Sequence, residues 1–163
     1  MNKGFTLMEM LAVVLVVTLM MSFALPVYRS VRFEMRHSQA QEAALKMADA
    51  MRTYYTRTKG GTIINSLDPT SDEGKTAMAS TDCTNLLATG IPNNGVDIPS
   101  DIAQLFACGY LSYKDFRELP YVFTAQGRAD PLVVVTGLDR AGQYKDKSFS
   151  VSKKMIVVEE EED

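Results

Sequence analysis

The apolar residues divide the chain into an amino-terminal span, an amphipathic segment and a carboxyl-terminal region of mixed periodicity. From Phe5 to Leu25, 17 of 21 residues are apolar, enough for a helix across a hydrocarbon core about 30 Å thick. Glu9 is the one charged residue in this span. A carboxylate there costs roughly 2.5 to 3.5 kcal/mol on insertion scales, so Glu9 requires a partner or a function.

A second helical pattern follows the apolar span. From Val27 to Lys59 there is no glycine or proline, and apolar residues recur at helical spacing. Pro26 predicts a kink between the two helical segments, and Gly60-Gly61 is expected to end the second one. The predicted buried face of this amphipathic helix contains Ala40, Ala44, Met47, Met51 and Tyr54 or Tyr55.

The remaining residues first read as loop and then as strands. Glycine and proline interrupt the chain to about Pro99, and Ser100-Asp101 is expected to cap a short helix that ends near Cys108-Gly109. The predicted strands are Tyr121–Gln126, Leu132–Thr136, Phe149–Val151 and Met155–Val158. A three- or four-stranded antiparallel sheet would lay one apolar face on the amphipathic helix, which predicts an α+β fold.

Composition adds few functional constraints. The net charge is −3 and the basic residues are scattered, so electrostatics do not support a nucleic-acid surface. In an oxidising compartment Cys83 and Cys108 would pair as a disulfide that stabilises by roughly 3 to 4 kcal/mol. Two unrelated buried thiols are the alternative. A zinc site is disfavoured, because one histidine and two cysteines do not complete four structural ligands.

The sequence contains no recognisable catalytic set. His37 is the only histidine, and we expect it to be solvated or interfacial rather than a ligand or base. The methionines fit apolar packing better than a metal site. The acidic run Glu159–Asp163 predicts a solvated tail, with contact to basic groups of a neighbouring subunit as the alternative. We therefore expect a protein that is not an enzyme and binds no cofactor.

A secretory signal peptide is a poor interpretation of the amino terminus. The apolar run exceeds the usual length of about 7 to 15 residues, it contains Glu9, and no Ala-x-Ala type cleavage site follows Leu25. A plain single-span anchor remains open on hydropathy alone. The positive-inside rule favours an outside amino terminus, because Arg29, Arg32 and Arg36 follow the span whereas Lys3 precedes it.

The segment Lys3-Gly4-Phe5-Thr6-Leu7-Met8-Glu9, with the apolar run behind it, resembles the leader of type IV prepilins and type II secretion pseudopilins. The resemblance covers about the first 30 residues, including Pro26. It implies that a prepilin peptidase cleaves between Gly4 and Phe5 on the cytoplasmic side and methylates the new Phe5 amine. It also implies a leader at 1–4, a transmembrane assembly helix at 5–26, an amphipathic helix at 27–60 and a globular head at 61–163.

The same resemblance implies how the chain would work. Glu9 lies four residues, about 6 Å of helix rise, beyond Phe5 and could pair with the Phe5 amine of a neighbouring subunit. The implied partners are copies of the chain in a helical filament, the peptidase, an inner-membrane assembly platform with its ATPase, and lipid before assembly. We give this resemblance more weight than the positive-inside rule, so the protein would sit in the inner membrane with its head in the periplasm, and later in an extracellular pilus or periplasmic pseudopilus.

The alternatives are a pseudopilin or minor pilin, or a membrane-anchored binding or enzymatic domain. Major pseudopilins bind calcium in a comparable region, where Asp130, Asp139 and Asp146 occur here. They usually carry an Asp-Pro-Trp-Gly type motif, whereas this chain has no tryptophan and reads Asp130-Pro131-Leu132. This departure favours a pilin, as does the cysteine pair, since similar pilins often close a carboxyl-terminal loop with a disulfide.

Overall fold

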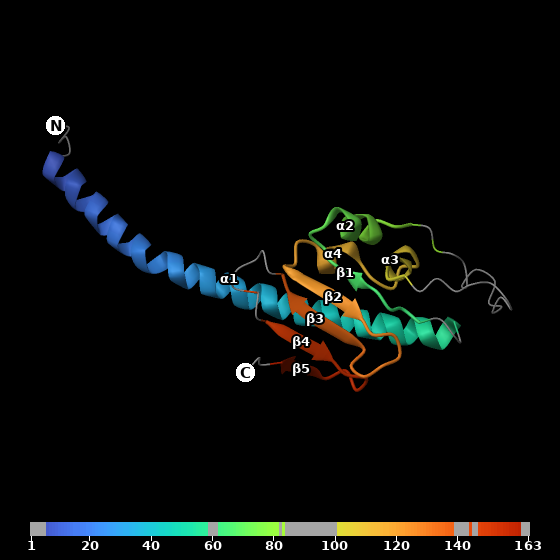
Figure 1. The fold of residues 1–163 in the computed structure, drawn as a ribbon. Helices are drawn as coiled ribbons and strands as arrows, with labels where there is room; N and C mark the ends of the chain where they lie inside the picture. The colour runs from blue at the N-terminus through green and yellow to red at the C-terminus, as the bar shows by residue number, and fades with distance from the viewer. Residues whose placement is uncertain are drawn as a thin grey trace. The chain divides into compact units, whose positions relative to one another are not determined.

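A computed structural model describes residues 6–58, 62–81, 83, 101–138, 144 and 147–160. These residues fall into two compact units, 1–36 and 37–163. In chain order the elements drawn in Figure 1 are α1 (Leu7–Thr58), β1 (Ser66–Leu67), α2 (Asp72–Met78), α3 (Ala103–Ala107), α4 (Tyr113–Phe116), β2 (Tyr121–Ala125), β3 (Val133–Gly137), β4 (Ser148–Val151) and β5 (Val157–Glu160).

Helix α1 is continuous over 52 residues and contains Pro26 in its interior. Proline removes one backbone donor but does not end the helix here. The kink at Pro26 stays a prediction. The helix ends at Thr58, and its expected stop signal, Gly60-Gly61, lies outside the described residues.

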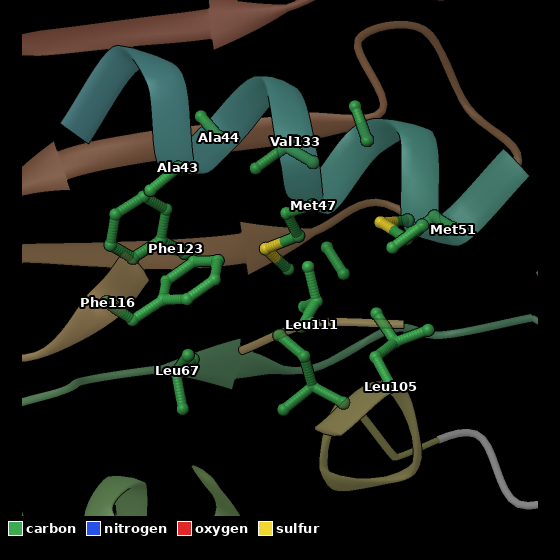
Figure 2. Packing of buried hydrophobic residues seen from close by; sticks show 14 of the residues in the cluster. Ala43, Ala44, Met47, Met51, Leu67, Leu105, Leu111, Phe116, Phe123 and Val133 are labelled. Carbon is green, nitrogen blue, oxygen red and sulfur yellow. The ribbon is translucent and has the colours of Figure 1, made fainter. Parts of the chain in front are cut away.

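The second half of α1 supplies one side of the core of the second unit. Ala40, Ala44, Met47 and Met51 are fully buried and Tyr54 is nearly so, which confirms the predicted face. Figure 2 shows Met47 and Met51 pointing toward aromatic and aliphatic side chains of the sheet and loops. Glu42 and Lys46 stay on the exposed side, paired at 3.0 Å. This amphipathic distribution lets the helix cover the sheet with its apolar stripe.

The sheet contains five strands in the order β1-β2-β3-β4-β5, and each neighbouring pair is antiparallel. Alternate residues of β2, namely Tyr121, Phe123 and Ala125, are buried, as are Val133 and Val135 of β3. This alternation is expected when one sheet face packs on a helix. The α+β class predicted from sequence is confirmed.

The predicted strands are correct in number and order for β2 to β5, but the sequence missed β1. The largest boundary error concerns the last strand, which begins at Val157 rather than Met155. Met155 has a φ of 62° and belongs to a turn in which the Ser152 N–H donates to the Ile156 carbonyl at 3.0 Å. Met155 and Ile156, which the sequence predicted as strand, therefore belong to the turn before β5.

Short helices complete the head. The helix expected before Cys108 is α3, although its N-cap residue is Ile102 and Ser100 lies outside the described residues. Asp101 still contributes, because its Oδ1 accepts a hydrogen bond from the Ala103 N–H at 3.0 Å. Buried edge-to-face contacts join Phe116 of α4 to Phe106 and to Phe123.

Candidate functional site

The start of α1 is built as a capping box around Glu9. The Glu9 N–H donates to the Thr6 hydroxyl at 3.3 Å, and the Thr6 N–H donates to Glu9 Oε2 at 3.4 Å. This reciprocal pair satisfies backbone donors that a helix start otherwise leaves without partners. Sequence reasoning missed this role, although Thr6-Leu7-Met8-Glu9 carries the Thr-x-x-Glu pattern that signals it. Glu9 therefore has a structural function besides any function in assembly.

The capping box leaves part of the Glu9 carboxylate available. Both hydrogen bonds that Glu9 accepts from Thr6, one from the N–H and one from the hydroxyl, end on Oε2. Oε1 accepts no hydrogen bond from any residue that the structure describes. Gly4 and Phe5, the predicted cleavage and methylation positions, lie outside the described residues. The pairing of Glu9 with a Phe5 amine stays a prediction.

The first half of α1 presents apolar side chains to its surroundings on every side. Between Leu7 and Val31 its large apolar residues are 45 to 81% exposed. Thr18 and Ser22 donate their hydroxyls to the carbonyls of Leu15 and Thr18, so these polar groups are satisfied within the helix. The mean hydropathy reaches 2.5 over an 18-residue window. A helix with this character is consistent with a membrane anchor or a signal sequence.

His37, which the sequence predicted to be solvated or interfacial, begins the second unit and is partly buried there. Its Nδ1 lies 2.7 Å from the hydroxyl of buried Tyr121, and its Nε2 lies 3.4 Å from Glu159 Oε1. Gln41 Nε2 donates to the same Glu159 oxygen at 2.9 Å. His37 Nε2 also lies 3.2 Å from Gln41 Nε2, so the imidazole contacts all three of the other residues. We call these four residues the His37 cluster.

The His37 cluster connects three elements that are distant in sequence. It joins α1 to β2 through Tyr121 and to β5 through Glu159. Burial raises the pKa of the Tyr121 hydroxyl, and the nearby Tyr144 and Glu159 raise it further. A fully buried phenol offers no access to a substrate, so we assign this cluster a structural role. Its contacts span 84 and 122 residues, which explains why local sequence patterns could not reveal them.

The predicted disulfide is present. Cys83 and Cys108 are bonded, with their Cα atoms 4.8 Å apart. Cys108 caps the carboxyl end of α3, so the bridge joins Cys83 to the end of this helix. Neither cysteine is then available as a nucleophile or metal ligand.

The residues considered for calcium do not form a site in the part of the chain that the structure describes. Asp130 Oδ1 accepts a hydrogen bond from the Lys153 N–H at 2.9 Å, whereas Asp139 and Asp146 lie outside the described residues. No cluster of three or more histidine, cysteine or acidic side chains with metal-binding geometry occurs among the described residues.

Comparisons with family models, curated proteins and solved structures found no match to this chain. The architecture alone is pilin-like: it combines a long apolar amino-terminal helix, an antiparallel sheet packed against the later part of that helix, and a disulfide.

Proposed function

We propose that the protein is a structural subunit of a type IV pilus-like filament, polymerised through the first half of α1. The observation that supports this most is the apolar surface between Leu7 and Val31, which remains exposed although the second unit has a core of its own. A helix that is apolar all round requires a surround of lipid or other helices. Membrane lipid supplies it before assembly, and copies of the same helix supply it in a filament.

In this proposal the helix moves from lipid into the filament, and Glu9 determines how it associates with neighbouring helices there. Apolar helices gain little by exchanging lipid for protein, so polar contacts and close packing must determine how they associate. Cleavage between Gly4 and Phe5 creates an amine, and Glu9 Oε1 is the acceptor that Thr6 leaves unused. An amine from a neighbouring subunit bound there neutralises a charge that is costly in hydrocarbon.

The proposal extends to location and partners. The subunit is held in the inner membrane with its head in the periplasm until a prepilin peptidase processes it. An assembly platform and ATPase then supply the work of extraction, and the product is an extracellular pilus or a periplasmic pseudopilus. The chain itself carries no catalytic role in this scheme.

Mass spectrometry of the protein from its native cells tests the processing step. We expect loss of residues 1–4 and a mass increase of one methyl group on Phe5. A protein that retains Met1 to Gly4 would contradict the proposal, and the apolar helix would then be a simple anchor.

Substitutions at Glu9 separate its capping role from its charge. Glu9→Gln keeps a side-chain acceptor for the capping box but loses the negative charge, whereas Glu9→Ala loses both. We expect both variants to be cleaved but neither to form filaments, measured by electron microscopy of sheared surface material. Glu34→Gln, at an exposed position on the same helix, is the matched control and should assemble normally. Normal filaments from Glu9→Gln would show that capping alone explains this residue.

A further inference from the structure

A basic groove lies beside the carboxyl-terminal end of α1. It has a volume of about 400 Å³ and contains no carboxylate among its described lining residues. Arg52, Arg128 and Lys153 are exposed, and none of them forms an ion pair with a described residue. The residues that line this basic groove are Arg52, Tyr55, Thr56, Arg128, Leu132 and Lys153.

Contacts within the head hold Tyr55 and Arg128 in place in the groove. The Arg128 guanidinium lies 5.4 Å from the centre of the Tyr55 ring, a cation–π distance. Tyr55 in turn contacts the backbone of Ile63 through its hydroxyl, which accepts from the Ile63 N–H at 3.1 Å. Asp130 is the neighbouring acid in sequence, and its Oδ1 binds the Lys153 backbone N–H rather than a basic side chain. The side-chain charges of Arg52, Arg128 and Lys153 are therefore available to bind an anionic partner.

The strand register places Glu160, the first residue of the acidic segment, at the end of the sheet opposite the groove. Val133, Val151 and Val157 are aligned across β3, β4 and β5 near the groove, whereas Glu160 is aligned with Ser148 at the far end. Strand β5 therefore runs away from the groove and ends at Glu160.

The two charged ends are well separated along the head. Glu159 binds Gln41 of α1, whereas the groove begins at Arg52, eleven residues or about 16 Å further along the helix axis. The direction of β5 and this separation favour a contact between molecules over one within a molecule. Because Glu159 is held by the His37 cluster, the residues that remain for a partner are 160–163, all acidic.

We propose that the basic groove binds the acidic segment Glu160–Asp163 of a second copy of the chain. This inference rests on the proposed filament. It adds a contact between the heads of two neighbouring subunits, which sets how the subunits follow one another in the filament. Such a contact joins two different surfaces and need not close on itself, which is the requirement for an open polymer. Opposite charges at the two ends also steer subunits into one polarity.

Zero-length coupling of assembled filaments tests the contact directly. A carbodiimide joins a lysine amine to a carboxylate only when the two groups touch. In filaments made from mixed ¹⁴N and ¹⁵N full-length protein, we expect amide links between Lys153 and residues 160–163 that carry both labels. Lys153→Arg keeps the charge, should still assemble and should lose these links.

The outcomes of this coupling separate the two proposals. If filaments form but Lys153 couples only within one molecule, or to another acidic segment, the groove proposal fails and the filament proposal stands. If the wild-type protein is never cleaved or assembled, both fail.

Charge reversal provides a second test. Changing Glu160, Glu161 and Glu162 to Lys should reduce filament yield about tenfold, the change that about 1.4 kcal/mol produces. The double variant Arg52→Glu with Arg128→Glu should do the same, and combining the two sets should restore most of the yield. Lys114→Glu, an exposed reversal on α4, is the matched control. Equal yields in all variants, or no rescue in the combination, would overturn the contact.

Discussion

The two halves of α1 lie in one uninterrupted helix but have opposite environments. Large apolar residues from Leu7 to Val31 are at least 45% exposed, whereas Ala40, Met47 and Met51 are fully buried. Hydrophobicity alone does not explain this difference, because the first half is the more apolar one. The second half is buried since its apolar residues form one stripe that matches the sheet, and the first half has apolar residues on all sides.

Residue size separates the halves as well. Valine, leucine and methionine dominate the first half, whereas alanines at 40, 43, 44 and 48 dominate the buried stripe of the second. Small side chains let a helix approach a sheet closely, and the two methionines fill the remaining gaps. The second half of α1 is thus shaped to pack against the sheet of its own chain. The first half suits a uniform surround such as lipid or similar helices.

The largest expected effect comes from truncating the buried stripe. Met47→Ala should destabilise the head by roughly 2 to 5 kcal/mol, because it removes buried atoms and leaves a cavity. Met35→Ala removes the same atoms from an exposed position of the same helix and should leave head stability unchanged. Denaturant unfolding of the full chain in detergent, followed by tyrosine fluorescence, measures both. Equal losses would show that the halves do not differ in this way.

Removing the disulfide should have the next largest effect. Cys83→Ser with Cys108→Ser frees a loop that spans 25 positions, which should cost about 3 kcal/mol. The loss should appear in the unfolding of the head, while circular dichroism from the first half of α1 in detergent stays constant. Reduction of the wild-type protein should reproduce the result, and a loss of helix signal in the first half would contradict it.

A smaller effect is expected from the His37 cluster. His37→Leu leaves the buried Tyr121 hydroxyl without its partner, which should cost about 1 to 3 kcal/mol. Adding Tyr121→Phe removes the stranded hydroxyl and should recover part of that loss. A double-mutant cycle on unfolding free energy measures the coupling, and strictly additive losses would argue against the hydrogen bond.

The smallest effect concerns alkaline pH. Burial raises the pKa of Tyr121 above its ordinary value of 10.0, so the folded protein keeps this phenol neutral while the unfolded chain ionises it. The stability linked to Tyr121 is complete below pH 10 and is lost as the pH rises above it, by up to about 1.4 kcal/mol per pH unit. Unfolding titrations should be less steep for Tyr121→Phe. Tyr54 and Tyr55, whose pKa values burial also raises, keep some slope in that variant.

Most of the fold followed from sequence periodicity. The stripe on α1 and the alternation in β2 and β3 are strong signals, because each depends on residues close in the chain. Strand β1 escaped prediction since it has two residues, Ser66 and Leu67, inside a region rich in loop signals. Its existence depends on pairing with Thr124 and Phe123, more than 50 positions later.

The candidate site was predictable to a different degree at each residue. The acid in the apolar span was evident from sequence, whereas its capping partner Thr6 was not predicted, although the two residues have capping-box spacing. The contacts of His37 were not predictable locally, because its partners Tyr121 and Glu159 are distant in the chain. The basic groove combines residues of α1 with residues after β2 and β4, so no single stretch of sequence reveals it.

The bond between Cys83 and Cys108 also bears on protein engineering. It keeps the two anchors of the intervening segment 4.8 Å apart whatever that segment contains. Doubling the length of a flexible loop between fixed ends costs only about 0.6 kcal/mol in closure entropy. A foreign peptide inserted between these cysteines but ahead of α3, whose Leu105 and Phe106 are buried, should therefore cost the fold little.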